Sequence, residues 1–279
     1  MQIKLRDLLQ IPTINKMYSK KVLVTFMSSL FLAVFAYGGH CADTVSHSGS
    51  LNPADYVGIS FWLATAIMLA ATVFFFVERD RAQGKWKTSL TIAGLVTGIA
   101  FWHYLYMRDV WVDTGTSPTV FRYIDWLITV PLQIVEFYLI LAAVTVVSVR
   151  VFWKLLVASL VMLVGGYLGE TQVLGVSEMV GFIIGMAGWL YIIYEIFKGE
   201  ASKLNANSGN LASQNAFKTI RLIVTVGWAI YPIGYLLGMG EANTSGALDI
   251  VYNLADLINK AAFGLAIWVA ATSDSESVS

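Results

Sequence analysis

Long apolar runs dominate the pattern of hydrophobic and polar positions after residue 50. Seven such runs carry few charges, and each is close to the ~20 residues that an α-helix needs to cross the hydrocarbon of a bilayer. Short polar connections separate them, and none of these marks a second domain. The pattern therefore predicts an all-α bundle of seven membrane-spanning helices, at Val57–Val77, Thr88–Met107, Val120–Val147, Val151–Gly169, Met179–Phe197, Leu222–Met239 and Ile250–Ala271.

The N-terminal segment has a different pattern. Lys20 and Lys21 precede the uncharged run Val22–Tyr37, as the charged and apolar parts of a secretory signal do. Ala36-Tyr37-Gly38 offers a cleavage site of the small-x-small kind, and an uncleaved eighth span is the alternative. The predicted organisation is a signal peptide over 1–38, an extracellular segment over 39–54, a transmembrane domain over 55–272 and a cytoplasmic tail over 273–279.

Basic residues are distributed unequally between the connections, and this predicts the orientation of the bundle. The connections after the first, third and fifth spans hold most of them, whereas the alternate connections hold only Arg108 beside acids such as Glu170, Glu178 and Asp249. Lys and Arg are enriched in cytoplasmic loops. We therefore expect the N-terminus outside and the C-terminus in the cytoplasm of a multi-pass protein of the inner (plasma) membrane.

Composition narrows the possible functions. Of 279 residues 57% are hydrophobic and only 13% charged, whereas soluble domains are about 25% charged. The net charge of zero argues against a nucleic-acid partner, which would require a basic surplus. One cysteine and three histidines cannot form a Cys/His zinc framework, and neither a phosphate-binding loop nor an HExxH motif is present. We expect no metal and no enzymatic activity.

Six ionisable residues of the predicted spans are expected to lie within the membrane rather than at its surface, where each costs several kcal/mol and is a candidate for function. The alternative for any one of them is a side chain that reaches the interface or an ion pair that joins helices. That alternative fails for Lys260, because apolar residues flank it on both sides. The six residues are His103, Arg122, Asp125, Glu136, Asp256 and Lys260.

The seventh span places a carboxylate beside the buried amine. Asp256 and Lys260 are four residues apart, so they share one helix face. A buried primary amine suits Schiff-base formation with an aldehyde, and the protonated product needs a counter-ion. Asp256 can provide one carboxylate, and the third span can provide a second.

The third span carries a column of polar residues. Thr129 lies one turn from Asp125, with Arg122 one turn away on the other side. Glu136 lies eleven residues beyond Asp125 on nearly the same face, roughly 16 Å away along the axis. Two acids at that separation cannot exchange a proton directly. A proton carrier between them is needed, and a Schiff base on Lys260 can be that carrier.

With these features the chain resembles the microbial rhodopsins, and among them the proteorhodopsins, from about Val57 to Trp268. The pattern RYxDWxxTxPxxxxE together with DxxxK in the seventh span is highly specific. The resemblance is carried by WHYLYMRDVWVDTG from Trp102, SPTVFRYIDWLITVPLQIVEFYLILAA from Ser117, GWAIYPIGY from Gly227 and YNLADLINK from Tyr252.

The resemblance implies a cofactor and a role for each buried charge. All-trans retinal would be bound to Lys260 as a protonated Schiff base. Asp125 would be the primary counter-ion and proton acceptor, and Asp256 the second counter-ion. Thr129 would complete a three-position motif that ends with Glu136 as the cytoplasmic proton donor.

The resemblance also implies a pocket, a colour and an assembly. Arg122 would orient the extracellular half of the proton path, and His103 would pair with the counter-ion aspartate. Family members form oligomers, which implies a pentamer or hexamer in the lipid bilayer, with Trp62 near the neighbour's histidine. Proteorhodopsins with glutamine at the position of Gln133 absorb blue light, which implies a blue-absorbing pigment. The pocket walls would be Trp126, Met162, Gly166, Trp189, Trp228, Tyr231 and Pro232.

These residues predict a light-driven outward proton pump. A light sensor coupled to a transducer is the first alternative, but a sensor gains nothing from a fast proton donor at Glu136. A pump for another ion is less favoured, because halide pumping needs a neutral group at Asp125 and the sodium-pump motif has Asn, Asp and Gln where this chain has Asp125, Thr129 and Glu136. Lys260 argues against an ordinary transporter.

Overall fold

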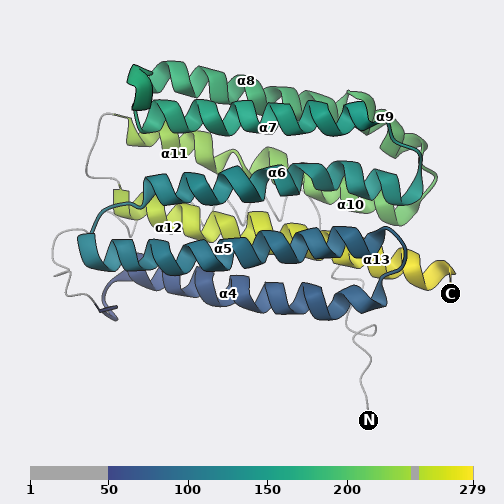
Figure 1. Ribbon diagram of the computed structural model, residues 1–279, viewed down its shortest axis with the longest axis horizontal. Coiled ribbons are helices and arrows are strands. Elements are labelled where there is room, and N and C mark those ends of the chain that lie inside the picture. The colour runs from purple at the N-terminus through teal and green to yellow at the C-terminus, as the bar shows by residue number, and fades with distance from the viewer. Residues whose placement is uncertain (1–49, 240–244, 279) are drawn as a thin grey trace, which may run out of the picture.

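The computed structural model describes residues 50–239 and 245–278. The predicted signal peptide over 1–38 and most of the extracellular segment lie outside the described residues. Within the described part, the secondary structure is helical and contains no strand. Figure 1 shows the helices running side by side along the long axis of the molecule.

Seven helical spans are long and apolar enough to cross a membrane, as predicted. The first five are regular α-helices. All five begin one or two residues before the predicted apolar run. α5 also reaches Thr114 rather than Met107 and α7 includes Glu170, whereas α6 ends at Val144 rather than Val147, because a helix does not end where its hydrophobic part ends. The five are α4 (Tyr56–Glu78), α5 (Trp86–Thr114), α6 (Thr119–Val144), α7 (Val149–Glu170) and α8 (Glu178–Phe197).

The sixth span differs from its prediction in both start and regularity. It begins at Leu211 rather than Leu222, since α10 (Leu211–Leu222) is a half-polar helix that a search for apolar runs misses. A π-helical turn, η3 (Ile223–Gly227), joins it to α11 (Ile230–Gly238). A short helix that we did not predict, α9 (Glu200–Asn207), precedes it.

The seventh span is interrupted in the same way. It consists of α12 (Ser245–Asp256), the π-helical turn η5 (Leu257–Ala262) and α13 (Phe263–Val278). The helix therefore includes most of the stretch predicted as a tail. This span packs against α4, α5 and α10, and a larger share of it is buried than of the other spans. It forms the centre of the bundle (Figure 1).

Glycines bring α7 and α8 unusually close together. A Cβ atom added to Gly181 would lie 2.4 Å from the Cα of Gly169, so no larger residue fits there without moving a helix. Small residues permit such close packing of membrane helices. This pair of helices forms one edge of the bundle, and α4 lies at the opposite edge (Figure 1).

The bundle has two ends with different connections. Its C-terminal end holds the end of α13 and the α4–α5 connection, and the opposite end, called the far end, holds the α5–α6 connection (Figure 1). Among the three charged residues of α6, Arg122 lies nearest the far end, Asp125 follows it, and Glu136 lies nearest the C-terminal end.

Candidate functional site

Lys260 lies at the centre of the bundle between carboxylates from two spans. Its side chain is 2% exposed. The Nζ atom is 2.5 Å from Asp256 Oδ2, one turn away on the seventh span, and 3.0 Å from Asp125 Oδ2 on α6. The structure thus brings together three groups that the sequence placed on two different spans.

The two carboxylates have different surroundings. Asp256 accepts hydrogen bonds from two tyrosines: Tyr104 Oη is 2.9 Å from Oδ2, and Tyr231 Oη donates to Oδ1. Both oxygens of Asp256 are therefore occupied. Sequence reasoning missed the role of Tyr104, because a tyrosine in mid-span is usually a packing residue and its partner lies 152 positions away.

Asp125 has fewer partners than Asp256. Among the described residues its carboxylate oxygens accept no hydrogen bond of good geometry, although Lys260 and His103 lie close. The His103 Nδ1 atom is 3.3 Å from Asp125 Oδ1 and 3.0 Å from the Ile99 carbonyl oxygen. Thr129 donates to the main-chain oxygen of Asp125 at 2.9 Å, not to its carboxylate. Asp125 thus retains capacity to bind a proton.

Arg122 is turned toward the far end of the bundle. Its Nη2 atom is 2.7 Å from Asp249 Oδ1, and its Nη1 atom is 3.0 Å from Asn253 Oδ1. The reading of Asp249 as a loop acid is wrong, because α12 begins at Ser245 and buries this residue. Glu170 is not a solvated loop acid either, since it ends α7 and accepts a hydrogen bond of 2.7 Å from Tyr123.

Glu136 is isolated in the C-terminal half of the bundle. It is 1% exposed, and neither carboxylate oxygen has a hydrogen-bond partner among the described residues. Ser89 of α5 lies close enough to act on the carboxyl of Glu136, and its hydroxyl makes no hydrogen bond within the described chain. An unpaired carboxyl in such a place costs far less when neutral than when ionised.

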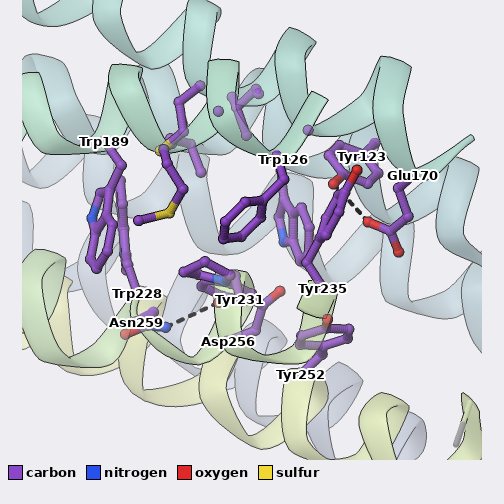
Figure 2. A pocket seen from close by; sticks show the side chains of 18 of the residues that line it. Tyr123, Trp126, Glu170, Trp189, Trp228, Tyr231, Tyr235, Tyr252, Asp256 and Asn259 are labelled. Carbon is purple, nitrogen blue, oxygen red and sulfur yellow. Dashed lines mark hydrogen bonds between the residues drawn. The ribbon is translucent and has the colours of Figure 1, made fainter. Parts of the chain in front are cut away.

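A cavity with largely apolar walls extends from Lys260 between α6, α7, α8 and the sixth span. Figure 2 shows Trp189 and Trp228 at one end, Tyr123 and Glu170 at the other, and Trp126 and Tyr231 between them. The structure places all the predicted wall residues on this cavity, namely Trp126, Met162, Gly166, Trp189, Trp228, Tyr231 and Pro232. Gln133, the predicted colour-tuning residue, lines it as well. Phe182 and Met186 also line the cavity. Sequence reasoning missed them, because apolar residues in mid-span are usually ordinary packing residues.

The aromatic walls are held in fixed orientations. The rings of Trp126 and Tyr231 meet edge to face at 4.8 Å. Trp189 donates from Nε1 to the carbonyl oxygen of Val224 at 3.0 Å, which lies in the π turn η3. Flat surfaces fixed in this way form a slot suited to a long, planar, apolar molecule.

The two π turns meet beside Lys260. Gln133 donates from Nε2 to the carbonyl oxygen of Asn259 at 2.5 Å, and the Asn259 amide donates to the Gly227 carbonyl oxygen at 3.2 Å and to Tyr231 Oη at 3.0 Å. A Cβ atom on Gly227 would clash with Asn259 Oδ1, so a larger residue there would have to displace this side chain. π-Helical turns are rare and occur frequently at functional sites.

Seven spans around a buried lysine with two carboxylates and an aromatic slot define a class of membrane protein, and comparisons identify the family. The model of the bacteriorhodopsin-like proteins matches residues 55–274. The chain therefore belongs to the bacteriorhodopsin-like family.

Individual relatives agree with this assignment. The chain is 55% identical to the green-light absorbing proteorhodopsin of Gamma-proteobacterium EBAC31A08 over 91% of this chain and 98% of the relative. The crystal structure of a blue light-absorbing proteorhodopsin from Med12 matches with a TM-score of 0.68 and 66% identity, over 79% of this chain and 100% of that one. Xanthorhodopsin, a light-driven ion pump with a dual chromophore, matches with a TM-score of 0.71 and 28% identity, over 82% and 98% of the two chains.

Proposed function

We propose that this protein is a light-driven pump that moves protons out of the cell with retinal bound to Lys260. The names of its relatives support light absorption and ion pumping. The observation that carries the proposal is the contrast between the two carboxylates at Lys260: Asp256 is saturated by tyrosine donors, whereas Asp125 has room for a proton. The protein acts as a transporter rather than an enzyme.

The cavity fits retinal in shape and chemistry. It is lined mostly by apolar and aromatic side chains, and the Lys260 amine is in its wall. When bound there in the all-trans form, retinal would supply a protonated imine whose geometry changes with light. Trp126, Trp189 and Trp228 would confine the polyene between flat surfaces, and Met162 and Gly166 would complete the slot.

Asp125 accepts the proton that leaves the Lys260 nitrogen. The 3.0 Å separation of nitrogen and carboxylate oxygen is short enough for direct transfer. Asp256 is held by two tyrosine hydroxyls, which donate hydrogen bonds to its carboxylate. Arg122 lies on the outward side of the path, and His103 lies beside Asp125. Both are positioning residues for the acceptor.

Glu136 returns a proton to the Lys260 nitrogen from the other side. It carries its proton in the resting state, because an unpartnered buried carboxyl is costly when ionised. Glu136 lies toward the C-terminal end, which the distribution of basic residues assigns to the cytoplasm. A proton that enters through Glu136 and leaves through Asp125 is moved outward.

The proposed setting is the inner membrane of a bacterium. The N-terminus faces outward, and the chains assemble as a pentamer or hexamer. The exposed side of α4 and α5 supports assembly: Trp62 is 49% exposed, and the Arg108 guanidinium lies 4.8 Å from the centre of its ring. His103, 19% exposed, lies on α5 as well.

The direct test is illumination of unbuffered cells that express the chain with added retinal. The medium should become more acidic, the signal should persist without sodium or chloride, and a protonophore should abolish it. Alkalinisation that the protonophore increases would mean that another ion is moved. A pigment that bleaches and recovers with no pH change in the medium would favour the light-sensor alternative.

A further inference from the structure

Asp249 is a buried carboxylate that the pump mechanism above does not use. It lies in α12 near the far end and is 0% exposed. Its Oδ1 atom accepts two hydrogen bonds, of 2.7 Å from Arg122 Nη2 and 2.9 Å from Ser117 Oγ. Its Oδ2 atom is buried and has no hydrogen-bond partner among the described residues. If Asp249 served only to pair with Arg122, a buried oxygen atom without a hydrogen-bond partner would be an unnecessary cost.

The charges around Lys260 and Arg122 do not balance. Two buried cations face three buried carboxylates, on Asp125, Asp249 and Asp256. With all five ionised, the group has an excess of one negative charge, which lowers the cost of placing a proton on one of the carboxylates during the cycle. The other titratable groups facing this set are His103 and Tyr104 of α5, Tyr123 of α6, Glu170 of α7, Tyr231 of α11 and Tyr252 of α12.

Of the three carboxylates, Asp249 is nearest the outside in the proposed orientation. Asp256 has both oxygens occupied, and Asp125 is the acceptor that must itself be emptied. Asp249 connects to the α5–α6 connection through Ser117, which is only half-buried. It also sits against Arg122, whose positive charge would otherwise repel a proton moving outward past it.

We propose that Asp249 is a second proton-binding carboxyl on the outward path, which receives the exported proton after Asp125 and passes it to the solvent near Ser117. This inference rests on the proposed proton-pump function. The O–H bond on Asp125 breaks, the proton crosses through water, and an O–H bond forms at Asp249 Oδ2. That bond then breaks toward the far end, and both carboxylates return to their ionised state. Arg122 keeps its charge throughout.

The test follows one turnover of the retinal-bound pigment in lipid nanodiscs after a light flash. Time-resolved infrared spectroscopy reports protonated carboxyl groups, and a pH-indicator dye in the medium reports the released proton. In the unaltered protein, a second carboxyl band should rise as the Asp125 band decays. This band should change frequency in Asp249→Glu and disappear in Asp249→Asn. In Asp249→Asn the interval between deprotonation of the Lys260 nitrogen and release to the medium should lengthen at least about tenfold.

Glu170→Gln is the matched control, because it removes another carboxyl near this end and should leave the second band in place. The proposal is overturned if no second band appears, or if the band survives Asp249→Asn and is lost in Glu170→Gln. Should Asp249→Asn fail to form a pigment, Asp249→Glu keeps the charge and still tests the band. Absence of proton release in the unaltered protein would instead reject the pump function itself.

Discussion

The two halves of the bundle interior, on either side of Lys260, have opposite characters. The far half holds two polar clusters: Tyr104 and Asp256 are joined beside Lys260, and Arg122 is paired with Asp249, each by ion pairs or hydrogen bonds. The C-terminal half is packed with apolar side chains such as Phe137 and Phe217, whose rings meet at 5.1 Å, and Glu136 has no partner there among the described residues. A proton can leave through a polar network more readily than it can enter through an apolar one.

The difference explains how a carrier can work in one direction. In the proposed cycle, the polar half offers further groups to receive the proton that Asp125 accepts, whereas Glu136 is the proposed donor in the apolar half. The return of the proton to Lys260 would then be limited by one residue, and its exit would be shared among several. The four predictions below separate these contributions, beginning with the group that both halves share.

Replacing Lys260 should have the largest effect. Lys260→Ala removes the only amine in the cavity wall among the described residues, so the protein should insert into the membrane but remain colourless with retinal. The absorption spectrum measures this directly. Lys154→Ala is the control, because that amine pairs with Glu200 at 3.2 Å at the C-terminal end of the bundle and should leave the colour intact. A visible band in Lys260→Ala that resists hydroxylamine would place the link elsewhere.

Asp125→Asn should abolish transport while the pigment still forms. An amide in place of the carboxylate cannot take the proton from the nitrogen 3.0 Å away. Flash spectroscopy near neutral pH should show no deprotonated state, and illuminated cells should not acidify the medium. Asp55→Asn is the control for loss of a buried aspartate in general, and it should leave pumping intact. Asp55 caps α4 by accepting a hydrogen bond from the Gly58 amide and lies outside the path. Pumping by Asp125→Asn would move the acceptor role to Asp256.

Glu136→Gln should slow recovery without affecting the first transfer. With no donor in the C-terminal half, protons must come from the solvent, so the deprotonated state should lengthen about tenfold for each unit of rising pH. Its decay at several pH values is the measurement. Glu195→Gln is the matched control: this carboxyl is also buried at the C-terminal end, but it accepts from the Glu200 amide at 2.9 Å. Equal decay in Glu136→Gln and the unaltered protein would remove Glu136 from the donor role.

Gln133→Leu should have the smallest effect, a shift of absorption to the red with pumping retained. Gln133 lines the cavity, and a dipole in a low-dielectric site can stabilise the ground-state charge of the chromophore and widen the energy gap. The absorption maxima should be compared at a pH where Asp125 is ionised in both proteins. Gln214→Leu, on the exposed side of α10, is the control. If the absorption maximum did not shift, Gln133 would have no role in colour, and its hydrogen bond to Asn259 would be structural.

The sequence predicted the spans and the central column of charges because both leave signals along the chain. A run of apolar residues predicts a membrane helix by length alone. Asp125, Lys260 and Glu136 stand out because ionisable groups are costly in that setting. α10 was missed for the converse reason, since half of its residues are polar and it does not look like a span.

The partners of the charged groups could not be predicted in this way. Tyr104 and Asp256 are 152 residues apart, and only the packing of α5 against the seventh span brings them together. Asp249 was assigned to a loop because apolar content rises only after it, although the helix starts at Ser245. The π turns were missed as well, because the residues of Ile223–Gly227 and Leu257–Ala262 suit an α-helix equally well.

The π turn at Lys260 has a consequence for the angular phase of the seventh span. Each residue turns an α-helix by about 100°. A wider turn holds an additional residue, so the two parts of the span need not share one continuous helical phase. Asp249 of α12 can face Arg122 while Trp268 of α13 faces Glu78, 2.9 Å away. Deleting one residue from Leu257–Ala262 would restore a regular helix and turn one of these two faces away from its partner.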